Sequence, residues 1–159
     1  MATKIRVLVV DDAASVREAV RRMLEMEDDF LVVGEAADGE EAVQAARRLV
    51  PDVILMDINM PRLDGISAAR AILAEVPTSV VMLSVEGDLE YLRRAMQSGA
   101  RDYLVKPFTP EDLAQAIRRC ARERLAGAEG RSRRGRVITV FGTKGGVGRT
   151  TIAANLAAA

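Results

Sequence analysis

Residues 53–65, with the sequence VILMDINMPRLDG, are the stretch around which the rest of the chain is organised. Four apolar residues, two of them β-branched, form a run that is too short for a helix and is typical of a strand buried on both faces of a parallel sheet. The run ends at Asp57, and Pro61 together with Asp64-Gly65 predicts a turn before the next helix. Asp57 should therefore lie at the carboxyl edge of a central strand, where open α/β sheets bind their ligands.

Polar residues also follow three other apolar runs of the same kind. These are Asp11 and Asp12 after residues 5–10, Ser84 after residues 79–83, and Lys106 after residues 101–105. Carboxylates gathered at one edge disfavour each other's ionisation and are tolerated mainly around a cation, and an all-oxygen set suits Mg²⁺. An acid cluster beside a hydroxyl and an ammonium predicts a site for a phosphoryl group carried on a carboxylate. The simpler alternative is that Asp12 only caps a helix and is unrelated to Asp57.

Helical patterns alternate with the predicted strands, to which residues 30–36 add one more. The apolar spacing predicts helices over residues 13–26, 39–50, 66–73, 88–98 and 110–125. Strands joined by helices run parallel with right-handed crossovers, which favours a doubly wound α/β fold, (βα)₅, with a five-stranded sheet of order 2-1-3-4-5. In that order the first and third strands are neighbours, so Asp11 and Asp12 should reach Asp57.

The candidate site and its flanking motifs resemble the receiver domain of two-component response regulators. The resemblance rests on Asp11, Asp12, Asp57, Ser84 and Lys106, with the motifs Met60-Pro61-x-x-Asp64-Gly65 and Lys106-Pro107-Phe108. It covers residues 4 to about 125, so we expect a flavodoxin-like receiver domain over residues 1–125. One departure is Val85 after Ser84, where receivers usually carry a small Ala or Gly.

The resemblance implies a phosphorylation-dependent signalling switch. Asp57 would accept a phosphoryl group from a sensor histidine kinase, a phosphotransfer protein or a small phosphodonor, and would later lose it by self-dephosphorylation. Mg²⁺ would be held by Asp12, Asp57 and the Asn59 carbonyl, with Asp11 acting through water. Lys106 would neutralise charge and Ser84 would bond the new phosphoryl oxygens. Tyr103 would then turn inward and change the face formed by residues 88–98, 101–105 and 110–125; the alternative for Tyr103 is an ordinary half-buried strand aromatic.

A different pattern follows residue 125. Residues 126–135 carry three glycines and no periodicity, which predicts a basic linker, and residues 136–159 read strand, Gly-rich loop and Ala-rich helix. This resembles the start of a deviant P-loop domain of the partitioning, septum-placement and pilus-assembly ATPases. The phosphate-binding candidates are Lys144, Gly145, Gly146, Gly148, Arg149 and Thr150. Arg149 replaces the usual phosphate lysine, so we expect no ATP hydrolysis from these residues and ATP binding only in a longer protein.

The net charge of zero averages two unlike regions. Residues 1–117 hold 13 basic and 21 acidic side chains, whereas residues 118–136 hold eight Arg and two Glu. The basic segment could contact nucleic acid, an anionic membrane or the acidic domain, but a solvated linker is the simpler interpretation. Since no helix-turn-helix pattern is present, we expect no nucleic-acid partner. No apolar run is long enough to span a membrane and no signal region is seen, which predicts a cytoplasmic protein. A homodimer is a further expectation.

The rival hypothesis comes from another functional class. Residues 1–125 could be a pseudo-receiver that only docks or dimerises beside an ATPase of the partitioning and pilus-assembly type. The intact Asp57, Ser84 and Lys106 argue against such degeneration. A domain that only docks would have no need of a phosphoryl acceptor, a hydroxyl and an ammonium at three strand ends.

Overall fold

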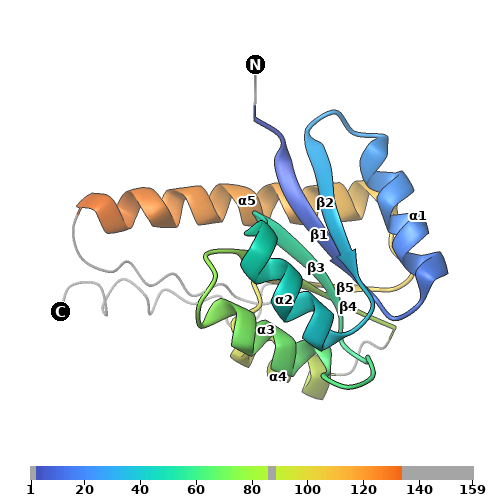
Figure 1. The fold of residues 1–159 in the computed structure, drawn as a ribbon. Helices are drawn as coiled ribbons and strands as arrows, with labels where there is room; N and C mark the ends of the chain where they lie inside the picture. The colour runs from blue at the N-terminus through green and yellow to red at the C-terminus, as the bar shows by residue number, and fades with distance from the viewer. Residues whose placement is uncertain (1–2, 86–88, 134–159) are drawn as a thin grey trace. The chain divides into compact units, whose positions relative to one another are not determined.

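Strands and helices alternate strictly along the part of the chain that the computed structural model describes, residues 3–85 and 89–133. In order, the elements are β1 (Ile5–Val10), α1 (Ala14–Glu25), β2 (Phe30–Ala36), α2 (Gly39–Leu49), β3 (Val53–Asp57), α3 (Gly65–Leu73), β4 (Ser79–Ser84), α4 (Leu89–Gln97), β5 (Asp102–Val105) and α5 (Pro110–Arg133). The strands form one parallel sheet in the order β2-β1-β3-β4-β5. The predicted doubly wound fold and strand order are therefore confirmed (Figure 1).

The sheet separates two apolar cores, because successive side chains of a strand point to opposite faces. On β1, Val7 and Val9 pack with α1 and the first part of α5, whereas Leu8 and Val10 pack with α2, α3 and α4. Figure 1 shows α2 and α3 in front of the sheet and the first part of α5 behind it. All five residues of β3 are buried, as expected for a central strand covered on both faces.

The register of the central strands determines which strand ends lie next to each other. β1 pairs with β3 so that Val10 lies beside Met56, and β3 pairs with β4 so that Asp57 lies beside Leu83. The residue directly after β1 and the last residue of β4 therefore lie next to the end of β3. This places Asp11, Asp57 and Ser84 at one edge of the sheet, as the predicted strand order requires.

Helix α5 differs from the prediction. It continues to Arg133, past the expected end at Leu125, so the irregular conformation predicted for residues 126–133 is wrong. Glycine costs a helix only about 1 kcal/mol relative to alanine, and the remaining residues of this segment are mostly good helix formers with no proline. The two glycines there therefore do not destabilise the helix enough to end it.

The chain divides into two compact units, Met1–Ala121 and Arg122–Ala159, and the first unit contains the whole sheet. The predicted strand, Gly-rich loop and helix of residues 136–159 lie outside the described residues, as do positions 134 and 135 of the predicted linker. Within the described ranges, no helix combines the length and the apolar character that crossing a membrane requires.

Candidate functional site

Three carboxylates meet at the carboxyl edge of the sheet. Asp57 is the last residue of β3, and Asp11 and Asp12 directly follow β1, its hydrogen-bonded neighbour. One oxygen from each of the three groups lies within 4.8 Å of the others. Asp11 and Asp57 are buried and Asp12 is exposed. The predicted meeting of these acids is confirmed, and their all-oxygen donor set fits a hard divalent cation such as Mg²⁺.

Lys106 bridges two of these acids. Its Nζ donates to Asp11 Oδ2 at 2.8 Å and to Asp57 Oδ1 at 3.1 Å. Its backbone N–H donates to the Ser84 carbonyl at 2.7 Å, which holds the chain after β5 against the end of β4. The sequence predicts an ammonium beside the acid cluster, and these two bonds place Lys106 there.

Burial and neighbouring charges together shift the pKa values of two groups in this cluster. Burial raises the pKa of Asp57 above its ordinary value; the Lys106 ammonium opposes this rise, and the charges of Asp11 and Asp12 add to it. Burial alone would lower the pKa of Lys106, but its bonds to Asp11 and Asp57 outweigh burial and raise it. Three carboxylates therefore share one ammonium, an arrangement that favours binding of another cation.

Two further hydrogen bonds, besides the one from Lys106, hold Asp11 in place. Its Oδ1 accepts the Ala13 N–H at 2.9 Å, and its backbone carbonyl accepts Nη1 of Arg17, on α1, at 2.6 Å. Sequence reasoning did not single out Arg17. Its only signal is a basic residue six positions after a strand-end acid, which many amphipathic helices carry, so the contact becomes visible only in the fold.

The loop after Asp57 is closed by the Asp64-Gly65 pair. Asp64 caps α3 by accepting the Ser67 N–H at 2.9 Å, and Gly65 N–H donates to the Ile58 carbonyl at 2.8 Å. A Cβ on Gly65 would lie 2.0 Å from the backbone oxygen of Asp57, so only glycine fits this close approach. The predicted turn is confirmed, and its tightness holds Asp57 in place.

The other predicted residues occupy positions around the acids. Ser84 is buried at the end of β4, and Asn59 is exposed in the loop after β3. Tyr103 on β5 is half-buried and packs against the core that includes α2, α3 and α4. The phosphate-binding candidates Lys144, Gly145, Gly146, Gly148, Arg149 and Thr150 lie outside the described residues.

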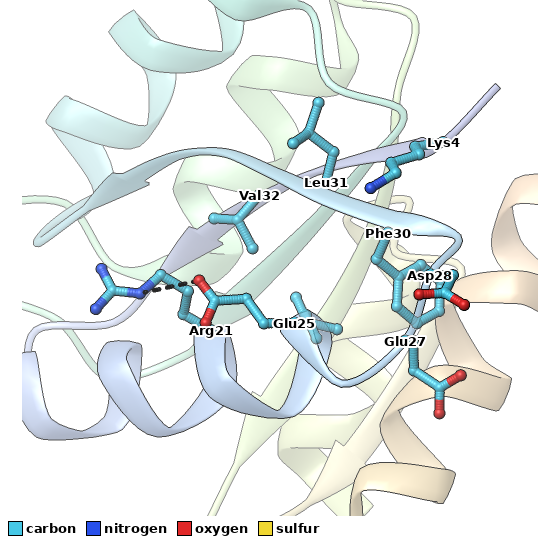
Figure 2. Close-up of a pocket in the computed structure, with 9 residues that line it drawn as sticks. Lys4, Arg21, Glu25, Glu27, Asp28, Phe30, Leu31 and Val32 are labelled. Carbon is cyan, nitrogen blue, oxygen red and sulfur yellow. Dashed lines mark ion pairs between the residues drawn. The ribbon is translucent and has the colours of Figure 1, made fainter.

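A pocket at the opposite edge of the sheet differs from the acid site in the charges that line it. Figure 2 shows it between the end of α1 and the start of β2, at the amino edge of the strands, with a volume of about 260 Å³. Arg21 on its wall pairs with Glu25 at 3.8 Å and with Glu35 at 3.5 Å. Because these charges are largely exposed and satisfy one another, the pocket gathers no reactive cluster comparable to the acid site.

Comparisons with known proteins agree with this geometry. The family model described as "Response regulator receiver domain" matches residues 7–118. The transcriptional regulatory protein DegU of Brevibacillus brevis is 39% identical over 116 residues, covering 72% of this chain and 49% of that protein. The response regulator domain of Thermotoga maritima CheB matches with a TM-score of 0.71 and 39% identity, covering 75% of this chain and 97% of that chain.

A second similar structure contains a ligand-bound relative. It is the CheX-CheY-BeF3-Mg+2 complex from Borrelia burgdorferi, with a TM-score of 0.68 and 28% identity, covering 72% of this chain and 87% of that chain. This chain spans about half, or less, of the curated relatives it matches, 49% of DegU and 32% of a protein-glutamate methylesterase from Methanococcoides burtonii. The similarity to these relatives lies in one shared domain.

Proposed function

Because this chain belongs to the response regulator receiver domain family, we propose that it is a phosphorylation-dependent signalling switch whose phosphoacceptor is Asp57. The observation that carries the proposal is the cluster of Asp11, Asp12 and Asp57 with Lys106 bridging two of them. Receiver domains are phosphorylated by histidine kinases, so the proposed phosphodonor is a sensor histidine kinase or a phosphotransfer protein.

The residues present fit Mg²⁺, which when bound would neutralise negative charge around the transferring phosphoryl group. Asp12, Asp57 and the Asn59 carbonyl would hold it, with Asp11 acting through water. In support, Asp12 is exposed and both oxygens of Asp11 already accept hydrogen bonds within the protein.

In the proposed reaction, a carboxylate oxygen of Asp57 attacks the phosphorus of the donor. A new O–P bond forms while the bond from phosphorus to the donor breaks, and the donor leaves with that electron pair. The Lys106 ammonium, 3.1 Å from Asp57 Oδ1, favours the ionised carboxylate against the effect of burial and would then pair with the phosphoryl oxygens. The buried hydroxyl of Ser84, at the end of the neighbouring strand, would donate to the same oxygens.

The output of the switch is also a proposal. Tyr103 is half-buried and already contacts the α2, α3 and α4 core. On phosphorylation it would turn further inward and change the face formed by α4, β5 and α5. The attached module would be an ATPase of the partitioning and pilus-assembly type, which rests on residues 136–159 of the sequence alone. The homodimer and the cytoplasmic location stay predictions.

The test is incubation of the chain with acetyl phosphate, with Mg²⁺ or with a chelator, followed by intact-mass spectrometry. We expect the mass of one phosphoryl group with Mg²⁺, and almost none with the chelator. Hydroxylamine should remove the group, because an acyl phosphate reacts with it and a serine phosphate does not. Labelling that ignores the chelator would contradict the proposal.

Val85 should slow this chemistry. It directly follows Ser84 and is 63% exposed, so its branched side chain would crowd the approach of a phosphodonor and of the hydrolytic water. We expect Val85→Ala to speed phosphorylation by acetyl phosphate, loss of the phosphoryl group, or both, by up to roughly tenfold, which corresponds to about 1.4 kcal/mol of barrier. The measurement is the rate of gain and loss of phosphoryl mass.

The matched control is Val50→Ala. Val50 is another exposed valine, but it caps the end of α2 at the amino edge of the sheet. Both rates should stay at the wild-type value in this control. Unchanged rates in Val85→Ala itself would show that the branched side chain does not hinder access.

A further inference from the structure

One further buried carboxylate of the described residues lies outside the acid cluster. Asp38, between β2 and α2, is only 2% exposed, and both of its oxygens are in use. Oδ1 accepts the Glu41 N–H at 2.9 Å and so caps α2, while Oδ2 accepts Nε of Arg62 at 2.9 Å. The pKa of Asp38 is held below its ordinary value, mainly by the Glu41 bond and further by Arg62. Asp38 is therefore an ionised carboxylate with two separate partners.

Arg62 reaches Asp38 from the loop between β3 and α3. Its backbone φ is +66°, in the left-handed region that arginine seldom adopts. Its side chain is 65% exposed, so burial does not account for its position. A strained residue persists only where its surroundings determine its conformation, and such residues gather near functional sites. Here the ion pair to Asp38 is the contact that holds the arginine.

A backbone contact reinforces this ion pair. The Gly39 N–H donates to the Leu63 carbonyl at 3.1 Å, and a Cβ on Gly39 would lie only 2.2 Å from that oxygen. Two successive loop residues, Arg62 and Leu63, are thus attached to two successive residues at the start of α2. The loop is fixed at its other end by Ile58, whose N–H donates to the Leu83 carbonyl at 3.2 Å.

Asn59 lies in the short stretch between these two attachments. Its carbonyl is the ligand of the proposed metal site that comes from the loop and not from a strand end. The direction of that carbonyl depends on the backbone of the residues that follow it, up to the attachment at Arg62 and Leu63. A shift of this attachment would therefore move the Asn59 carbonyl relative to Asp57.

We propose that Asp38 and Arg62 form a positioning clamp that holds the β3–α3 loop and thereby sets the affinity of the acid site for a divalent cation. This rests on the proposed function, in which the Asn59 carbonyl is a ligand. Mg²⁺ requires nearly ideal octahedral geometry, so a small displacement of one ligand weakens binding. Asp38 and Arg62 are positioning residues and do not touch the cation.

The test measures Mg²⁺ affinity by titration calorimetry or by amide NMR shifts. Arg62→Asn removes the guanidinium, while asparagine tolerates the left-handed backbone. Asp38→Asn keeps a cap for α2 but has one acceptor oxygen for two donors. Supporting partners of metal ligands typically contribute about tenfold or more in affinity, so we expect each variant to bind Mg²⁺ roughly tenfold more weakly. Arg62→Lys keeps the charge and should recover part of the affinity.

The matched control is Glu75→Gln. It removes another Arg–carboxylate pair of α2, in which Arg47 donates to Glu75 at 2.6 and 2.8 Å, but at the amino edge of the sheet. Its Mg²⁺ affinity should equal that of the wild type. All titrations are made well below the melting temperature of each variant; if Arg62→Asn does not fold, Asp38→Asn and Arg62→Lys decide.

Each outcome separates the clamp from the function it rests on. Wild-type affinity in both clamp variants would overturn the clamp and leave the phosphoacceptor proposal standing. Equal weakening in Glu75→Gln would also overturn it, because the effect would then come from general loosening of α2. A wild-type chain that fails to bind Mg²⁺ would overturn the metal site itself, and the clamp with it.

Discussion

We expect Asp57→Asn to abolish the Mg²⁺-dependent acyl phosphate, with labelling by acetyl phosphate lowered at least about a hundredfold, or about 2.7 kcal/mol of barrier. Asparagine has nearly the same shape as aspartate, but its amide offers no carboxylate nucleophile, so the attacking oxygen is lost while the loop and the strand stay in place. Intact-mass spectrometry with and without chelator measures the effect. Asp52→Asn is the control, since Asp52 precedes β3 at the opposite edge of the sheet and accepts the Arg6 N–H at 2.8 Å.

The same substitution should stabilise the metal-free protein at neutral pH. Burial raises the pKa of Asp57 in the folded state, so the folded protein keeps this proton to a higher pH than the unfolded chain does. The free energy of unfolding of the wild type therefore falls as pH rises from about 3.9, the ordinary value for aspartate, through the higher folded pKa. Asparagine cannot ionise and escapes this loss.

The melting temperatures of both proteins should therefore be compared from about pH 4 to pH 7 without metal. The advantage of Asp57→Asn should be small at the acid end of the series and should grow toward neutral pH. An advantage that shrinks as pH rises would contradict the assigned direction of the pKa shift. Labelling that survives in Asp57→Asn would contradict the assignment of the phosphoacceptor instead.

Gly65→Ala should destabilise the domain by about 3 kcal/mol or more. The added Cβ would lie 2.0 Å from the backbone oxygen of Asp57, and backbone cannot swing aside as a flexible side chain can. Either the first turn of α3 or the end of β3 must move, and the latter displaces the phosphoacceptor. Urea unfolding gives the change in free energy, and Mg²⁺ titration shows whether the site is disturbed.

Gly34→Ala is the matched control for that experiment. A Cβ on Gly34 would lie 2.7 Å from Cδ1 of Leu49, the end of a side chain that can rotate away. Its cost should be at most about 1 kcal/mol, well below that of Gly65→Ala. Equal costs for the two variants would show that the approach of Gly65 to Asp57 is not the strict constraint that the geometry indicates.

Much of the site could be predicted because topology alone determines it. Parallel strands joined by helices all end at the same edge, so acids after β1 and β3 and a lysine after β5 must share that edge whatever their local conformation. The contact between Asp38 and Arg62 could not be predicted in this way. It joins two loops distant in sequence, and Arg62 stands at a variable position of a turn motif with no pattern to reveal its partner.

The predicted end of α5 at Leu125 was wrong for a different reason. Glycines at positions 127 and 130 and the lost apolar periodicity predict an irregular segment, but a glycine opposes a helix by only about 1 kcal/mol. Local propensity decides the conformation where no packing pattern is available. The residues between the glycines favour the helix, and α5 accordingly continues to Arg133.

Lys106 serves as an internal counterion. By bonding Asp11 and Asp57 at the same time, it allows the domain to bring buried carboxylates together before any divalent cation arrives. When a cation binds to a site that is already assembled, it stabilises the folded protein only by mass action. Some other metal sites must be filled before the protein can fold. The supply of cation would then govern how readily the domain reacts, while the folded domain itself would persist through cation depletion.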